Sequence, residues 1–142
     1  MISVAAQYAV RALIFLAFQQ PGEFVTAQDI ARRLEVSGTF LAKILRRMVD
    51  AGFVDSLRGP RGGLRLRVGA DRISVRDVVV AIDGIGLFTE CVLGLPGCGE
   101  RMPCPMHERW AETRKCIERD LAGETIGELA KGVKSGVRRV AP

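Results

Sequence analysis

The sequence predicts a mainly α-helical protein that carries one small β-hairpin. Three observations support this fold class. Apolar residues recur at helical spacing through most of the first 83 residues. A turn rich in glycine and proline separates two short strand-like runs between residues 53 and 68. Residues 106–122 then form a long, highly charged helical segment with a narrow apolar seam.

The composition is that of an ordinary globular protein with an uneven charge distribution. The chain has 142 residues, of which 48% are apolar and 26% charged, which excludes a disordered chain. A single His excludes a catalytic site built on several histidines, and we expect no enzyme. Residues 1–70 carry ten Lys/Arg against five Asp/Glu, whereas residues 71–142 carry eleven of each. Such a focused basic region favours a polyanionic partner, and a solvated basic face is the alternative.

The first predicted helix covers residues 2–20 and ends at Pro21-Gly22. It is apolar enough to resemble a signal or membrane segment. No basic residue precedes the apolar run, and Arg11 interrupts it, which argues against a signal peptide. The uncharged run after Arg11 is shorter than the roughly 20 residues that span a bilayer. We therefore expect a buried helix in a cytoplasmic protein with no membrane partner.

The next two predicted helices form a helix-turn-helix pattern. Thr26 begins one helix, with Asp29 three residues later in a capping-box arrangement, and a short turn follows at residues 35–36. Ser37 caps the next helix, over residues 38–51. The apolar side of this helix consists of Phe40, Leu41, Ile44, Leu45, Met48 and Val49. Its opposite face presents Thr39, Lys43, Arg46 and Arg47, as expected of a helix that enters a DNA groove.

The hairpin that follows is predicted to be the wing of a winged helix-turn-helix domain. Its turn, Gly59-Pro60-Arg61-Gly62-Gly63, lets the backbone approach a groove closely, and Arg58 and Arg61 can reach phosphates or the minor groove. A plain structural turn is the alternative, but the order of elements together with the charge favours double-stranded DNA as the partner. The predicted DNA-contacting residues are Ser37, Thr39, Lys43, Arg46, Arg47, Arg58, Arg61 and Gly62.

Three cysteines fall in a segment without predicted secondary structure. Ser74 and Asp77 cap a helix that ends near Asp83, and residues 84–105 then show no sustained periodicity. Cys91, Cys98, Cys104 and the only histidine, His107, form the pattern C-x6-C-x5-C-x2-H. Extracellular disulfides would require a secretion signal, and a cysteine protease would require a third group that orients the base. These residues instead favour a metal site.

Two kinds of metal site, zinc and an iron–sulfur cluster, fit this donor set. Structural zinc usually has short C-x2–4-C pairs, which are absent here, so the wide spacing favours the larger cluster. Four unrelated buried thiols remain an alternative.

The long charged helix is predicted to begin at Pro105 and to run to about residue 122. Its seam consists of Met106, Trp110, Thr113, Ile117 and Leu121. A partner chain is expected to cover this seam in a homodimer, with packing on its own domain as the alternative. Thr125 and Glu128 cap a last short helix. We therefore divide the chain into a DNA-binding domain (1–83), a cluster-binding loop (84–105) and a dimerisation and C-terminal helix region (106–142).

Three motifs give the chain a family resemblance. YAVRAL lies in the first helix, FLAKILRRMVDAGFVDSLRGPRGG covers the third helix and the wing, and CVLGLPGCGERMPCPMHERW covers the loop. Together they make the chain resemble the Rrf2-type (IscR/NsrR-like) winged-helix regulators of bacteria. The resemblance implies a dimeric transcription factor with a [2Fe–2S] or [4Fe–4S] cluster in each subunit. It implies thiolate ligands at Cys91, Cys98 and Cys104, a histidine ligand at His107, and a minor-groove element at residues 58–63.

Two departures from the family pattern bear on the fourth ligand. The gap between Cys91 and Cys98 is one residue longer than in the IscR-type pattern. Some relatives use an acidic residue from the partner's first helix, but no Asp or Glu precedes Glu23 here. His107 is therefore our first choice and Cys116 the second, with a buried inert thiol as the expected role of Cys116.

We therefore expect the protein to be a metal-binding redox sensor. We expect a DNA-binding regulator, with repression as the favoured action, that binds a palindromic promoter site as a homodimer. A cluster, [2Fe–2S] in preference to [4Fe–4S], would control DNA affinity in response to iron, redox or nitric oxide status. The alternative is a cluster-free winged-helix regulator with structural zinc or thiol-based redox sensing.

Overall fold

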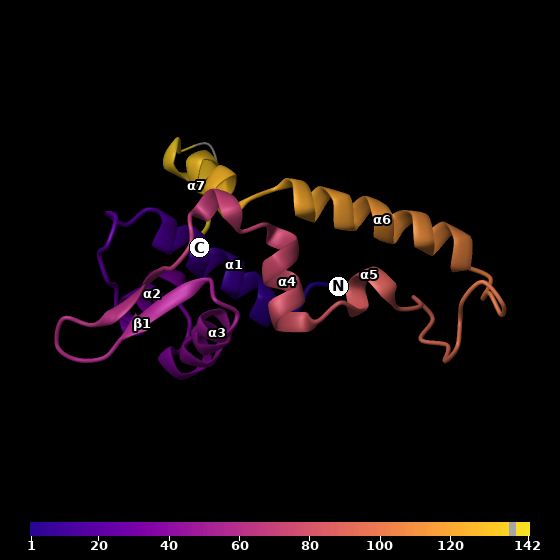
Figure 1. Cartoon of the computed structure of the whole chain (residues 1–142), viewed down its shortest axis with the longest axis horizontal. Helices are drawn as coiled ribbons and strands as arrows, with labels where there is room; N and C mark the ends of the chain where they lie inside the picture. Colours follow the sequence, from indigo (N-terminus) through magenta and orange to yellow (C-terminus); the bar gives the residue numbers. More distant parts are fainter. Residues whose placement is uncertain (137–138) are drawn as a thin grey trace.

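The computed structural model describes residues 1–136 and 139–142. A compact body is formed by the helices and hairpin of the first half of the chain, and one long helix extends away from it as an arm (Figure 1). The elements are α1 (Val4–Ala17), α2 (Ala27–Leu34), α3 (Gly38–Asp50), β1 (Val54–Leu57), β2 (Gly63–Leu66), η1 (Ala70–Arg72), α4 (Val75–Asp83), α5 (Gly86–Thr89), α6 (His107–Gly123) and α7 (Ile126–Lys134). The mainly helical fold with one antiparallel hairpin confirms the predicted fold class.

Helix α1 lies at the centre of the body. Its fully buried alanines, Ala6, Ala9 and Ala12, leave little side-chain volume, so neighbouring helices can approach closely. Helices α2, α3, α4 and α7 all contact α1. Leu13 of α1 and Ile126 of α7 are both fully buried in the same core, at a typical gain of about 1.5–3 kcal/mol for each large side chain. The C-terminal helix α7 therefore packs with the first half of the chain.

Side-chain caps fix where most of the helices begin. The hydroxyls of Thr26, Ser37, Ser74 and Thr125 each accept a hydrogen bond from the backbone N–H three residues later, as predicted. The predicted start of the first helix at residue 2 is wrong, because Ser3 caps α1 and the helix runs only from Val4 to Ala17. No helix in the described part of the chain combines the length and hydrophobicity needed to cross a membrane.

The hairpin is held against the body through a backbone bridge. Strands β1 and β2 pair in register from Val54 opposite Leu66 to Leu57 opposite Gly63. Leu64 exchanges two backbone hydrogen bonds, of 2.8 and 2.9 Å, with Val25 ahead of α2. Gly63 adopts φ +145°, and a Cβ there would lie 2.5 Å from the Val25 carbonyl oxygen. The close backbone approach therefore requires glycine at this position.

Two predictions for the second half of the chain need correction. The segment 84–105 is not wholly without secondary structure, because one helical turn, α5, forms where Phe88 becomes buried against α4. The long helix begins at His107 rather than at Pro105. It is held to the rest of the chain by contacts with α4 and α5, and an antiparallel bridge between Ser74 and Thr125 joins the start of α4 to the start of α7.

We predict that Gly63→Ala lowers the free energy of unfolding by about 2 kcal/mol, because the new methyl group overlaps the Val25 backbone and the residue must keep a strained φ. Urea unfolding followed by circular dichroism measures the change. Gly69→Ala is the matched control, since a Cβ at Gly69 meets no atom within 4 Å, and its effect should stay within about 0.5 kcal/mol. Equal stability of the two variants would contradict the role given to Gly63.

Candidate functional site

The polar face of α3 points away from the hydrophobic core. Leu41, Ile44, Leu45 and Met48 of this helix are buried, whereas Thr39, Lys43 and Arg46 on the other side are exposed. A left-handed residue, Glu35 at φ 53°, makes the sharp turn that separates α2 from α3. This arrangement leaves α3 available to a large partner along its whole polar face.

A groove separates α3 from the wing. It has a volume of about 610 Å³, and its lining includes Arg46 and Asp50 from α3 and Arg58 and Gly62 from the wing. The structure thus brings together predicted contact residues from two elements. Arg46 and Arg58 form no ion pair with the described residues, whereas Arg65 and Arg67 lie 3.6 and 3.9 Å from the Asp55 carboxylate. The unpaired guanidinium groups are suited to phosphate binding.

The remaining predicted contacts lie in different surroundings. Ser37 is exposed, but its hydroxyl accepts the Phe40 N–H as the cap of α3. Arg61 is exposed at the tip of the wing. The Arg47 side chain points toward α4, where its Nη2 atom donates to the Ala81 carbonyl oxygen at 3.3 Å. Arg47 therefore ties α3 to α4 in this structure.

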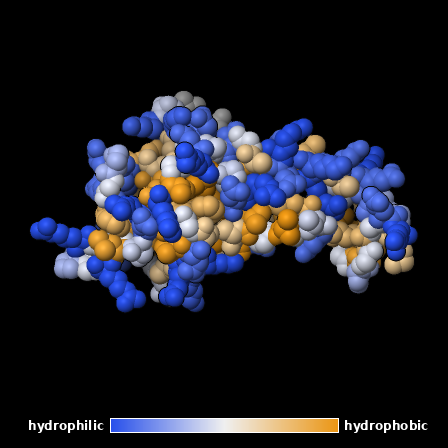
Figure 2. Space-filling view, viewed as in Figure 1, coloured by the Kyte–Doolittle hydropathy of each residue, from blue (hydrophilic) through white to orange (hydrophobic). Residues whose placement is uncertain are grey.

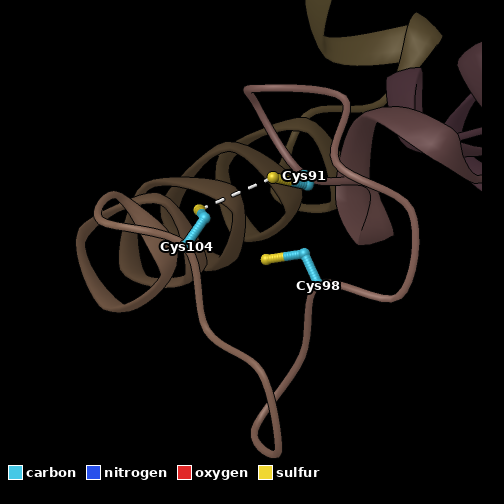
Figure 3. A group of neighbouring side chains, drawn as sticks. All are labelled: Cys91, Cys98 and Cys104. Carbon is cyan, nitrogen blue, oxygen red and sulfur yellow. Dashed lines mark hydrogen bonds between the residues drawn. The ribbon is translucent and has the colours of Figure 1, made fainter.

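Three cysteine side chains converge in the loop between α5 and α6. Figure 3 shows Cys91, Cys98 and Cys104 directed toward a common space beside α6. Their sulfur atoms all lie within 4.8 Å of one another, and Cys91 Sγ is 3.6 Å from Cys104 Sγ. Two thiolates on one tetrahedral metal ion would be about 3.8 Å apart, given metal–sulfur bonds of about 2.3 Å. The sulfur donors and their spacing therefore fit a thiophilic metal centre.

The histidine and the fourth cysteine lie in very different positions. His107 is the first residue of α6, and its Nδ1 atom is 3.4 Å from Cys98 Sγ. The imidazole therefore borders the group of three cysteine sulfurs (the sulfur group) on the side of Cys98, but it does not lie within 4.8 Å of all three. Cys116 is exposed on α6 and lies outside the sulfur group, so the expectation that it is a buried thiol is wrong.

The pKa values of two of the loop cysteines are shifted in opposite directions. A hydrogen bond from the Leu95 backbone is the main cause that lowers the pKa of Cys91 from 9.0 to about 7, outweighing partial desolvation. Burial raises the pKa of Cys104 above 9.0. Of these two thiols, Cys91 is therefore the one more readily present as a thiolate, the form that binds metals.

The apolar seam of α6 is only partly covered within the chain. None of the α6 residues is buried. Ile117 and Leu121 are half-buried against Val75, Val79 and Phe88, whereas Met106 and Thr113 are exposed. Figure 2 shows hydrophobic residues reaching the surface around the N-terminus and α5, beneath this arm. The C-terminal half of the seam therefore packs on its own domain.

Two residues near the sulfur group were missed by the analysis of the sequence. Trp110 Nε1 and Arg114 Nη1 both donate to the backbone carbonyl of Glu90, the residue before Cys91. The sequence places Trp110 only in the apolar seam. The available signal was the i, i+4 spacing of two long hydrogen-bond donors just after the last loop cysteine.

A family model and a similar bacterial protein that match this chain are both described as transcriptional regulators. Residues 2–132 match the family model Rrf2, described as an iron-dependent transcriptional regulator. The chain is 34% identical over 123 residues to the HTH-type transcriptional regulator IscR of Aliivibrio salmonicida, covering 87% of this chain and 73% of that protein.

Solved structures show the same fold. CymR, the global cysteine regulator of B. subtilis, superposes with a TM-score of 0.79 at 24% identity, covering 92% of this chain and 96% of that one. IscR of T. potens superposes with a TM-score of 0.77 at 24% identity, covering 98% and 92%.

We predict that iodoacetamide alkylates Cys91 before Cys104 in the metal-free protein at pH 7, because about half of the Cys91 thiols but very few of the Cys104 thiols are then ionised. Quenched time points analysed by peptide mass spectrometry give both rates. The Cys91 rate should fall as the pH is lowered from 8 to 6. Alkylation of Cys104 at the rate of Cys91 would show that the loop backbone does not favour one thiolate.

Proposed function

This chain belongs to the Rrf2 family of transcriptional regulators, and we propose that an iron–sulfur cluster on Cys91, Cys98 and Cys104 controls its affinity for DNA. Its relatives are transcriptional regulators rather than enzymes. The observation that supports the proposal most strongly is the convergence of three sulfur atoms within 4.8 Å of one another in a loop beside α6. When bound, a cluster would supply a centre sensitive to iron supply, redox state or nitric oxide.

We propose His107 as the fourth ligand, because its Nδ1 atom already lies 3.4 Å from Cys98 Sγ. The imidazole would bind the metal through a ring nitrogen that carries no proton. Three thiolates and one imidazole make four ligands, a number that both [2Fe–2S] and [4Fe–4S] clusters take. We favour [2Fe–2S] because histidine replaces cysteine on one iron of Rieske-type [2Fe–2S] centres. Cys116, exposed and outside the sulfur group, is left without a ligand role.

A continuous set of contacts connects the loop with the DNA-reading helix. Glu118 of α6 binds Arg76 of α4 at 2.7 Å, and the Arg76 guanidinium lies 5.4 Å from the centre of the Phe88 ring. Arg47 of α3 in turn donates to Ala81 of α4. An ordered loop would therefore favour one position of α6. Through its contacts with both helices, α4 would transmit that position to α3. In the proposed homodimer this would change the spacing of the two recognition helices.

The DNA contacts that we propose are divided between bases and backbone. Thr39 and Lys43 of α3 would lie nearest the base edges in the major groove. Phosphates or the minor groove would be bound by Arg46, Arg58 and Arg61, with Ser37 and Gly62 at the same surface. Arg47 uses Nη2 for the Ala81 carbonyl, so it would reach a phosphate only through its other N–H groups. A homodimer would repress by occupying a palindromic promoter site with half-sites about 34–36 Å apart.

A second function, sensing by the thiols themselves, is favoured by one observation. Cys91 Sγ and Cys104 Sγ lie 3.6 Å apart, so a small movement would allow a peroxide to oxidise the two thiols to a disulfide, with the peroxide reduced to water or an alcohol. A structural zinc ion on the same sulfurs is the other cluster-free form. Metal analysis together with thiol titration of the oxidised protein separates these possibilities from the cluster.

We predict that Cys98→Ala yields a colourless protein after anaerobic reconstitution with ferrous iron and sulfide, because removal of one of three converging sulfurs opens the site. Visible absorbance, iron and acid-labile sulfide are measured. Cys116→Ala is the matched control and should bind iron and sulfide like the wild type, since Cys116 lies outside the sulfur group. Normal absorbance in Cys98→Ala would remove this residue from the ligand set.

We also predict that Arg58→Ala and Arg61→Ala each reduce the slope of log K against log salt concentration by about one unit, because each removes one phosphate contact from the wing. Fluorescence anisotropy with a promoter fragment measures the slope. Arg119→Ala removes a positive charge from α6, where Arg119 pairs with Asp120 at 3.2 Å, and should leave the slope unchanged. An unchanged slope in both wing variants would argue against the wing contact.

A further inference from the structure

The carbonyl oxygen of Glu90 accepts two hydrogen bonds from α6. Trp110 Nε1 donates at 2.9 Å and Arg114 Nη1 at 2.8 Å. The two donors are four residues apart and so lie on the same side of the helix. Because a carbonyl oxygen has two lone pairs, this one is fully used. We call this arrangement of Glu90, Trp110 and Arg114 the carbonyl clamp.

The clamp acts on Cys91 through the backbone. The Glu90 carbonyl and the Cys91 nitrogen belong to one planar peptide unit, so fixing the carbonyl also fixes the start of Cys91. On the other side, the Cys91 carbonyl accepts the Gly94 N–H at 3.0 Å. Cys91 is therefore held from both directions by hydrogen bonds within the chain.

The clamp also closes the cysteine loop onto one helix. Cys104 is fixed to α6 by the chain itself, because it lies three residues before His107 and its carbonyl accepts the His107 N–H at 3.0 Å. Cys91 lies thirteen residues earlier and is fixed to α6 by the clamp. The two ends of the loop are thereby brought together, with Cys91 Sγ 3.6 Å from Cys104 Sγ. Keeping the ends together before metal binding reduces the loop entropy lost on binding.

The space around Trp110 indicates that hydrogen bonding is important for the orientation of its ring. Trp110 is half-buried and borders a cavity of about 580 Å³ that is also lined by Ser3, Asp83 and Cys91. Packing therefore encloses the indole on only part of its surface. The bond to Glu90 fixes the direction of the ring, and Arg114 reinforces it through the same acceptor.

We propose that Trp110 and Arg114 are positioning residues that hold Cys91 in place for metal binding through the Glu90 carbonyl. This proposal rests on the proposed function, since it takes Cys91 as a ligand. It predicts that loss of either donor makes the site release its metal faster, although all three cysteine ligands are still present.

The first test uses the metal-free protein and its only tryptophan, Trp110. Arg114→Met removes one donor and keeps a side chain of similar length. It should raise the acrylamide quenching constant of the tryptophan about twofold, because the shared acceptor becomes less well fixed. Arg109→Met is the matched control, since Arg109 is exposed on the same helix and its side chain has no polar partner among residues 1–136 and 139–142. Equal quenching of wild type and Arg114→Met would overturn the clamp.

The second test measures release of iron to EDTA after anaerobic reconstitution. Trp110→Phe, which keeps an aromatic ring but has no N–H, should lose iron about 5-fold faster than the wild type, and Arg114→Met about 10-fold faster. Arg114→Lys restores a charged donor and should return to within about 3-fold of the wild type. Thermal unfolding of the metal-free variants shows whether they fold. If Trp110→Phe does not fold, the arginine series decides alone.

The outcomes separate the clamp from the proposed function. Wild-type release rates in both Arg114→Met and Trp110→Phe would overturn the positioning role while leaving the metal site intact. If the wild type itself retains neither iron nor sulfide, the proposed function fails. The quenching comparison on metal-free protein then decides the clamp, since a raised constant in Arg114→Met supports it and an unchanged one overturns it.

Discussion

The closure of one irregular loop onto helix α6 is the constraint on which the candidate metal centre depends. Cys91, Cys98 and Cys104 are separated by long gaps, and no regular element would bring their sulfurs within 4.8 Å of one another. Closure is achieved at one end by chain connectivity, which places Cys104 just before α6, and at the other by the hydrogen bonds to the Glu90 carbonyl. Without that closure the thiols would be spread over a flexible segment, and metal binding would have to supply all of the ordering free energy. The loop therefore belongs structurally to α6, although it follows α5 in the sequence.

Helix α4 connects this arm with the DNA-reading half of the molecule. It contacts α1, α3 and α6, so movement of the arm cannot leave the body unaffected. The contacts on its two sides differ in kind, with an Arg76–Glu118 ion pair toward α6 and a hydrogen bond from Arg47 toward α3. Because Arg76 and Glu118 are both partly buried, this pair is screened less than a fully exposed one. An arrangement of this kind can transmit a small change of loop order over the length of the molecule without melting the core.

The elements that the sequence predicted well are those determined by local chemistry. Ser37, Ser74 and Thr125 begin helices because each hydroxyl caps a backbone N–H three residues away, and the wing follows from its glycine-rich turn. The sequence predictions were wrong where contacts between residues far apart in the sequence determine the structure. Helix α5 exists because Phe88 is buried against α4 and α6, and Cys116 is exposed because neither α4 nor α5 covers that side of α6. The candidate ligands were expected from a family resemblance. The spacing of Trp110 and Arg114 places both donors on one side of α6, but their roles depend on a shared acceptor, the Glu90 carbonyl, which their spacing does not identify.

The most direct test of the account is the iron and acid-labile sulfide content of the wild-type protein after anaerobic purification, compared with its DNA affinity before and after metal removal. The account predicts about two iron and two sulfide per chain, as for a [2Fe–2S] cluster, visible absorbance, and a different affinity for a promoter fragment in the two forms. Protein that contains neither element when isolated, and takes up neither on reconstitution, would contradict it.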